Sequence, residues 1–426
     1  MESKAGRDWR SILLAIACTG GAILAVAMGV IVIVVQAAMT LRGNQQNPPL
    51  IDGVLLASAI LFVGALLIPA AYYSLQRLIG EEVAADTTKP MNIGAGFLIA
   101  FIWLGISALT QIFYGNTFLR WITPPLYILS IGLPVYFFAR LAIGGLNAGS
   151  KQRTWGALGT GMLLGPSLAS LVELMLVVLL LFGIAAYLAF HPELMSVFNT
   201  IKAQINNTSN PDDILTLLSP YLLNPMVIAL ALLFFSVVAP LVEETAKSLT
   251  VWIVFDHLSS PAQGFVIGAL SGTGFGLVES LLASVQPDSS WGTTLLVRGG
   301  STMMHIAAAS LTGWGIAWFR TTKRPGRLIG MYALAMFLHS LWNACVILIV
   351  TGSVRTALGA HMENITGMAF IVFGASILAI IALSMPIALG MINWRLRTSS
   401  SPTRPTVTLS LPFPLGEEGK GKGGER

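Results

Sequence analysis

Long, continuous apolar runs are the feature that most limits how this chain can fold. They recur along the whole sequence, and each is long enough to cross about 30 Å of hydrocarbon as a helix. They do not alternate apolar and polar residues, as the strands of a membrane barrel do. The sequence therefore predicts an all-α, polytopic transmembrane bundle of about ten helices. These are expected near residues 11–37, 52–75, 93–114, 124–146, 162–189, 224–255, 262–284, 294–319, 327–351 and 366–392.

Composition also favours a membrane environment. Charged residues make up 10% of the 426 residues, whereas a soluble domain carries about 25%. So few charges cannot cover a soluble globule, and we expect the lipid bilayer to solvate much of the surface. The net charge of +5 forms no basic stripe with interleaved aromatic residues, which argues against nucleic-acid binding. Cys18 and Cys345 lie inside apolar runs and predict neither a disulfide framework nor a cysteine metal site.

Basic residues in the connectors predict the orientation in the membrane. Cytoplasmic connectors carry an excess of lysine and arginine. This rule is met when both termini are cytoplasmic. The inner connectors then hold Arg77, Lys89, Lys151, Arg153, Arg320, Lys323, Arg324 and Arg327, and the outer ones hold Arg42, Arg120, Lys202 and Arg355.

The chain divides into four predicted regions. Residues 1–190 form a five-helix membrane region of unknown role. Residues 191–223 form an extracytoplasmic loop, in which apolar residues at helical spacing predict an interfacial helical hairpin, with a plain solvated loop as the alternative. Residues 224–392 form a second five-helix core. Residues 393–426, rich in Ser, Pro, Gly and Lys, are expected to be a disordered cytoplasmic tail.

Ionisable residues inside the predicted helices are concentrated in the second half. Such residues are costly in a bilayer and usually face the bundle interior or a watery cavity. In the first five helices Glu173 is interior, and we expect a structural role because it has no polar companions nearby in sequence. Four successive helices of the second half carry more polar groups than packing explains. These are Glu243, Glu244 and Lys247, then Glu279, then Arg298 and His305, and then His339 and Asn343.

The spacing of these residues suggests chemistry. Glu243 and Lys247 are four apart and can form an ion pair on one helix face. Glu244 points about 100° away from Glu243, so one acid can be neutralised while the other faces elsewhere. His339 and Asn343 also share a face. A buried glutamate near a cation can serve as a general base, an imidazole can orient water, and an amide can stabilise an oxyanion.

Small residues mark the seventh predicted helix. Gly268, Gly272, Gly274 and Gly276 occur within nine positions of one another. Glycines at such spacing let neighbouring backbones approach closely in membrane proteins. We therefore expect close approach of a neighbouring backbone to this helix.

Together these motifs resemble the PrsW family of intramembrane proteases. The segment from Glu243 to Lys247 matches the family's EExxK signature. The segment from Gly274 to Glu279, then His305, then the segment from His339 to Asn343 follow in the family's order. The resemblance covers roughly residues 225–350 and extends more distantly to the CAAX-protease and bacteriocin-processing (CPBP) group. Lys247 in place of that group's later arginine, and Ser301 in place of its phenylalanine, fit the PrsW branch better.

The resemblance implies roles for individual residues. Glu244 and His305 would activate water, while His339 and Asn343 would stabilise the oxyanion. The expected catalytic residues are Glu243, Glu244, His305, His339 and Asn343, with Lys247 and Glu279 supporting them.

Metal use stays open at this point. Family descriptions call these proteins metalloproteases, and Glu244, His305 and His339 could bind zinc while leaving a position for water. The chain has no HExxH pattern, which would be a local zinc signature. In the metal-free alternative, which we favour from the sequence, glutamate and histidine act on water directly.

The resemblance implies an intramembrane endopeptidase, a hydrolase that cuts a peptide bond in a membrane-associated protein substrate. We expect a multi-pass protein of a bacterial plasma membrane. The alternative is a proton- or ion-coupled transporter, because intramembrane acids and histidines also form ion relays. Transporters often have repeated halves, whereas the polar residues here are confined to one half. The enzyme is therefore the favoured interpretation.

Overall fold

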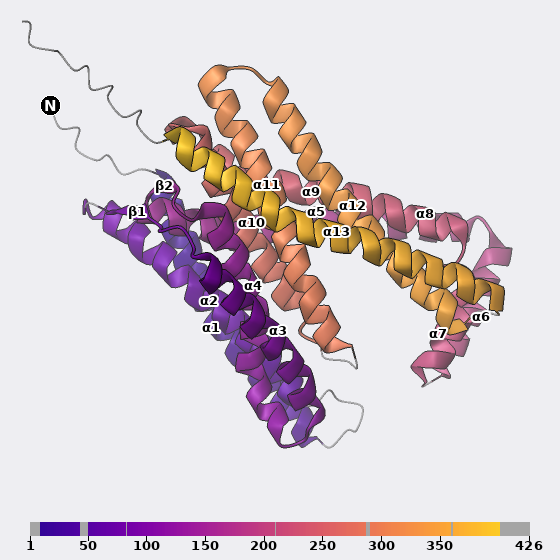
Figure 1. Cartoon of the computed structure of the whole chain (residues 1–426). Helices are drawn as coiled ribbons and strands as arrows, with labels where there is room; N and C mark the ends of the chain where they lie inside the picture. The colour runs from indigo at the N-terminus through magenta and orange to yellow at the C-terminus, as the bar shows by residue number, and fades with distance from the viewer. Residues whose placement is uncertain are drawn as a thin grey trace, which may run out of the picture.

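The apolar runs form long helices in the computed structural model, which describes residues 9–42, 50–81, 83–208, 210–286, 290–358 and 361–400. Within these residues, nine helical segments are long and apolar enough to cross a membrane. The all-α, polytopic bundle predicted from the sequence is therefore confirmed (Figure 1).

Five long helices and a small sheet make up the first half. The helices are α1 (Trp9–Leu41), α2 (Leu50–Leu78), α3 (Ile93–Gly115), α4 (Thr123–Ile143), which follows the 3₁₀ turn η1 (Leu119–Ile122), and α5 (Lys151–Ala189). Strand β1 (Ala85–Thr87) pairs antiparallel with β2 (Asn147–Ser150) and joins the connector after α2 to the connector after α4.

The second half contains shorter helices followed by long ones. They are α6 (Pro192–Asn206), α7 (Pro211–Leu222), α8 (Pro225–Leu233), the π-helical turn η2 (Phe234–Val238), α9 (Ala239–Ile253), the 3₁₀ turn η3 (Phe255–His257), α10 (Pro261–Ala283), α11 (Trp291–Thr322), α12 (Gly326–Leu358) and α13 (His361–Ser400). Segments α8, η2 and α9 together form one candidate membrane span, Pro225–Ile253.

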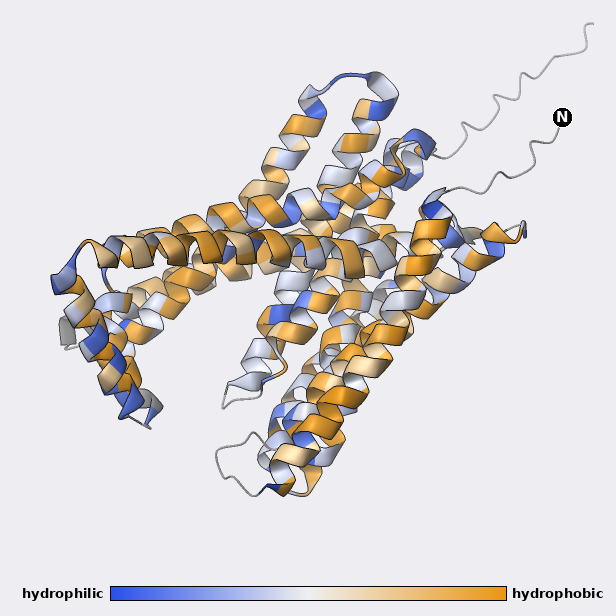
Figure 2. Cartoon of the chain, turned by 180° about the vertical axis from the view of Figure 1, so that it is seen from behind, coloured by the Kyte–Doolittle hydropathy of each residue, from blue (hydrophilic) through white to orange (hydrophobic). Residues whose placement is uncertain are grey.

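Large apolar side chains cover the outside of the long helices. Phe97, Phe101 and Leu383 each keep more than 70% of their surface exposed. Figure 2 shows hydrophobic residues along most of the helix surfaces and hydrophilic residues gathered near the connectors. In water this surface would favour aggregation. Lipid tails, however, solvate such side chains well, so the outer surface suits a bilayer.

Helix α11 differs from the other long helices. The sequence predicts a span near 294–319, and the structure forms a 32-residue helix there. It is not among the nine apolar spans. Helices α10, α12 and α4 pack around it, and most of its residues are buried. Protein therefore solvates much of α11 and permits a more polar sequence there.

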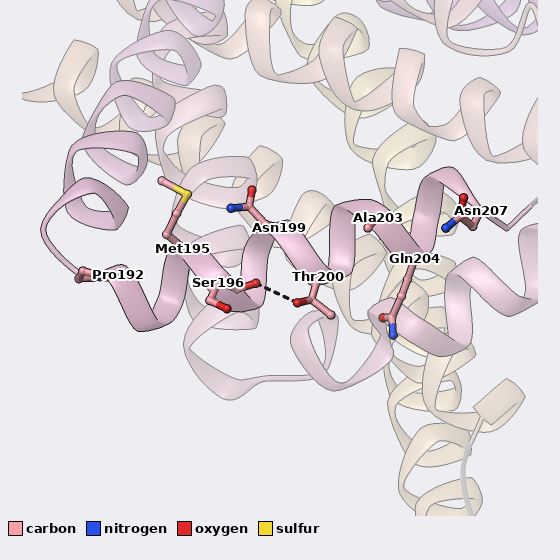
Figure 3. A pocket seen from close by; sticks show the side chains of 8 residues that line it. All are labelled: Pro192, Met195, Ser196, Asn199, Thr200, Ala203, Gln204 and Asn207. Carbon is pink, nitrogen blue, oxygen red and sulfur yellow. Dashed lines mark hydrogen bonds between the residues drawn. The ribbon is translucent and has the colours of Figure 1, made fainter.

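The segment between α5 and α8 folds into two short helices, α6 and α7. This is the segment for which the sequence predicts a helical hairpin, and both halves of that hairpin are helical. Figure 3 shows one face of α6, which carries polar groups such as Asn199, Thr200 and Gln204. The Thr200 hydroxyl donates to the Ser196 carbonyl oxygen one turn earlier, at 3.0 Å. The same face of α6 also carries Met195 and Ala203, so it mixes polar and apolar side chains.

Helix α13 extends further than the sequence predicts. The sequence predicts a disordered tail from residue 393, but α13 continues to Ser400. Asn393 explains the difference, because its side-chain amide donates to the carbonyl oxygens of Ala142 and Gly144, at 2.7 and 3.0 Å. These bonds hold the end of α13 beside the end of α4. The rest of the predicted tail, residues 401–426, lies outside the described residues.

Glycines place α10 tightly between α5 and α11. A Cβ atom at Gly268 or Gly272 would collide with backbone carbonyl groups of α11, and one at Gly274 would collide with the backbone of α5. The predicted close approach of this helix is therefore confirmed. It fixes the register of α10 against α11, which carry Glu279 and His305.

Replacing Gly272 by valine is expected to destabilise the protein. The added side chain would meet the His305 carbonyl and the Ala309 side chain, and overpacking of this kind costs about 1–3 kcal/mol. The thermal unfolding midpoint in detergent should fall. Gly105→Val is the matched control, because a Cβ atom there meets nothing within 4 Å. An equal fall in both variants would contradict the proposed packing.

Candidate active site

Four helices bring acids and histidines together inside the bundle, and one of them, α10, supplies Glu279. Helix α9 supplies Glu243, Glu244 and Lys247, α11 supplies His305, and α12 supplies His339. Glu244 is fully enclosed, and Lys247, His305 and His339 are each 1% exposed. Charged groups are seldom buried unless they are paired, so the contacts among these residues decide what the site can do.

The start of α9 is set by a wide turn before a proline. In the π-helical turn η2 the backbone N–H of Ala239 donates to the Phe234 carbonyl, five residues back. The same five-residue step would pair the Phe235 carbonyl with the backbone N–H of residue 240. That residue is Pro240, which has no N–H to donate. The side-chain amide of Asn343 donates to the Phe235 oxygen instead, at 2.8 Å. Asn343 therefore joins α12 to the beginning of the acid-bearing helix.

Lys247 lies among three polar partners. Its Nζ atom is 2.8 Å from Glu244 Oε1, 3.1 Å from Glu243 Oε2 and 2.7 Å from His305 Nδ1. It also lies over the ring of Phe275, 4.1 Å from the ring centre. The predicted ion pair with Glu243 is present. The further contacts offset the cost of removing the ammonium group from water.

Each histidine is held by its own carboxylate. His339 Nδ1 is 2.8 Å from Glu244 Oε1, and His305 Nε2 is 2.5 Å from Glu279 Oε2. The His305–Glu279 contact is close, and it is an ion pair when the ring is protonated. Glu279 is held in turn by Arg298, whose Nη2 is 2.9 Å from Glu279 Oε1. A carboxylate behind an imidazole fixes the ring and raises the basicity of its other nitrogen.

The other nitrogen of each histidine faces Glu243. His339 Nε2 lies 3.8 Å and His305 Nδ1 lies 3.9 Å from Glu243 Oε2. The two rings are perpendicular, with centroids 5.0 Å apart. Glu243 keeps 13% of its side chain exposed. The structure thus points two oriented imidazoles and one partly accessible carboxylate at a common place.

These three residues fit a metal ion. One ligand atom from each of Glu243, His305 and His339 lies within 4.8 Å of the others. Two imidazoles and one carboxylate are a common ligand set of catalytic zinc, and the carboxylates behind both rings are typical of metal sites. The Lys247 ammonium group contacts two of these three side chains, Glu243 and His305. A bound cation would therefore require the ammonium group to move toward Glu244. The sequence-based ligand set named Glu244, but the structure groups Glu243 with the histidines because Glu244 lies behind His339.

The hydrogen bond that Asn343 makes in the described part of the chain goes to the backbone of η2 and not to an acid or histidine. Sequence reasoning assigns Asn343 an oxyanion role, whereas its amide nitrogen donates to the Phe235 carbonyl in the structure. The reason is Pro240, which leaves that carbonyl without its backbone donor. Trp342, on the same helix, is buried.

Glu173 belongs to the surroundings of the site, which sequence reasoning did not foresee. It lies on α5, which packs against α9 and α10. It is within electrostatic range of Glu243, Glu279 and Lys247. Its Oε1 atom is buried and has no hydrogen-bond partner among the described residues. The signal in the sequence is a lone carboxylate inside an apolar run, but its neighbours in space are about 70 or more positions away in sequence.

Comparison with known proteins agrees with this geometry. Residues 173–381 match the family model described as PrsW family intramembrane metalloprotease. The matched stretch contains every residue of the cluster, and it supports an intramembrane protease acting on membrane proteins. No curated protein matches the chain, and no solved structure does.

Proposed function

We propose that this chain is a PrsW-type intramembrane endopeptidase, which hydrolyses a peptide bond in a membrane-associated protein substrate. The observation that carries the proposal is the arrangement of His305 and His339. Each ring is held by a carboxylate on one side and faces Glu243 on the other. The family match over residues 173–381 supports the same activity. The more distant relationship to the CAAX-protease group is part of this proposal.

Glu243 is the acid best placed to contact a reacting water. Its side chain is partly exposed and faces both histidines, whereas Glu244 is fully enclosed. In this proposal Glu243 and the two imidazoles orient the water and accept its proton. Glu244 acts through other residues, because it positions His339 and neutralises Lys247. This differs from the sequence-based assignment of Glu244 as the base, since that carboxylate is buried behind the ring it holds.

In the alternative with a metal ion, Glu243, His305 and His339 would hold that ion as ligands instead of accepting the proton themselves. When bound, such an ion would polarise the substrate carbonyl and make its water more acidic. Glu279 and Arg298 keep His305 in place, and Glu244 keeps His339 in place. The surrounding helices limit the entry of bulk water, which strengthens every electrostatic contact inside.

Zinc binding by the purified protein tests the ligand set. The wild-type chain, stripped of metal, should bind one equivalent of zinc, and His305→Ala should lose most of it because one of three protein ligands is gone. His191→Ala is the control, because His191 lies at the start of α6, away from the cluster. Equal zinc content in both variants would contradict this ligand set. Full cleavage by the metal-free chain would favour direct glutamate and histidine chemistry.

A comparison of membrane proteins tests the activity itself. Cells carrying the wild-type chain should contain a shortened fragment of at least one membrane-associated protein. Cells carrying His305→Ala at the same abundance should contain only the uncut form. The same fragments with both chains would contradict the protease assignment, and an ion flux in vesicles that depends on His305 would favour the transporter alternative.

A further inference from the structure

A cavity of about 320 Å³ lies between α1, α5 and the end of α9. Its walls include Leu14 and Cys18 of α1, Gly156 and Leu163 of α5, and Ile253 of α9. None of the acid and histidine residues of the candidate active site lines it. Its volume is in the range of small-molecule sites, which is roughly 300–1,000 Å³. The cavity is therefore large enough for a ligand of its own.

The two ends of this cavity differ in chemistry. Three arginines, Arg10, Arg77 and Arg153, lie where α1 begins, α2 ends and α5 begins. Further along, the lining is mainly apolar and includes Leu14 and Leu163. The lining positions of α1 run from Trp9 to Cys18, which corresponds to about 14 Å of helix. The cavity therefore extends from the start of α1 along a helix that is a candidate membrane span.

The positive charge at this end is only partly balanced. Arg10 pairs with Asp256 at 3.5 Å, and the Asp256 side chain is 75% exposed. Arg77 and Arg153 are within electrostatic range of each other. Within the described ranges of the chain, neither forms an ion pair with a carboxylate. Arg153 donates to the backbone oxygen of His257, at 3.4 Å. An anion between these guanidinium groups would relieve their repulsion and accept charge-assisted hydrogen bonds.

The apolar wall indicates what the anion is attached to. A small soluble anion needs the arginines but gains nothing from an apolar passage along a membrane helix. An acyl chain would fill that passage and remove its surface from water. Trp9, which is 58% exposed and lies beside Arg10, resembles the aromatic residues that mark a membrane interface.

We propose that this cavity binds an anionic phospholipid from the leaflet on the side where α1 begins. Arg77 and Arg153 hold its phosphate, and α1 and α5 enclose one acyl chain. Basic pockets between membrane helices recognise anionic headgroups in this way. Thr250, Ile253 and Val254 at the end of α9 also line the cavity. A bound lipid would thus join the first helices to the helix that carries Glu243 and Glu244.

Native mass spectrometry of the full chain tests the charge recognition. The protein is mixed in detergent with phosphatidylglycerol or with phosphatidylcholine of the same acyl chains. The wild-type chain should retain phosphatidylglycerol preferentially. Arg77→Gln combined with Arg153→Gln should lower this retention about tenfold or more, because two headgroup contacts are lost. Lys323→Gln combined with Arg324→Gln is the control, since it removes the same charge outside the cavity lining.

Two further measurements on the full chain distinguish binding of a lipid from binding of a free anion. Inorganic phosphate alone should not raise the thermal unfolding midpoint, whereas phosphatidylglycerol should. A phosphatidylglycerol with a photoreactive acyl chain should label residues between 13 and 18 or between 156 and 164. The proposal would be overturned if the chain retained both lipids equally or if the two double variants retained phosphatidylglycerol equally. It would also be overturned if labelling were confined to other helices, or if phosphate raised the thermal unfolding midpoint as much as phosphatidylglycerol does. Labelling of the Arg77 and Arg153 variant at wild-type level would overturn it as well.

Discussion

Replacing Glu243 by glutamine is expected to lower the rate of substrate cleavage by about 10²- to 10⁴-fold, the usual contribution of a positioned acid or base. Glutamine has nearly the same shape but cannot accept a proton from water. It also leaves His305 and His339 facing a neutral group in place of a carboxylate. The rate is measured with purified protein in lipid vesicles and a membrane-tethered substrate.

The fold should survive this change. Lys247 keeps its 2.8 Å ion pair with Glu244 when Glu243 is neutral. The variant should therefore elute as wild type from a sizing column and unfold near the wild-type temperature. Glu193→Gln makes the same chemical change on the exposed helix α6, and it should leave the rate unchanged. Near-normal cleavage by the Glu243 variant would remove this residue from the reaction.

Replacing Lys247 by methionine is expected to destabilise the protein by about 3–5 kcal/mol, because removing one partner of a buried pair leaves an uncompensated charge. The Lys247 side chain is fully enclosed and contacts both glutamates and His305. Methionine has a similar length but no charge, so Glu244 would remain buried beside His339 alone. Thermal unfolding in detergent and the yield of monodisperse protein measure the loss.

A second substitution separates charge from packing. Adding Glu244→Gln to Lys247→Met removes the buried negative charge and should recover part of the lost stability. Lys202→Met, on the exposed surface of α6, is the control and should have little effect. If the double variant is as unstable as the sum of the two single variants, the buried ion pair does not explain the role of Lys247.

Contacts within one helix were predictable from the sequence. Glu243 and Lys247 are four residues apart, and the structure joins them at 3.1 Å. The apolar runs also predicted nearly all of the long helices, because a run long enough to span a bilayer can hardly form anything else. Helix α11 departs from this rule because protein surrounds it and accepts its polar residues.

Contacts between helices depended on packing that the sequence does not display. Glu279 meets His305 because glycines fix the register of α10 against α11. Asn343 donates to the Phe235 carbonyl because a π-helical turn before Pro240 leaves that oxygen without a backbone donor. Glu173 lies near the cluster because α5 packs on α9, although the two helices are far apart in sequence. In each case the partner was visible in the sequence, but the register that joins the pair was not.

The most direct measurement is cleavage of a membrane-tethered substrate by the purified chain in vesicles made with ¹⁸O-labelled water. Hydrolysis places one labelled oxygen in the new carboxyl terminus, and the wild-type chain should yield that labelled product. The His305→Ala variant should yield none, because alanine lacks the ring nitrogen that faces Glu243. The same labelled product from the His305 variant, or a wild-type chain that carries ions and cuts nothing, would contradict an active site built from these residues.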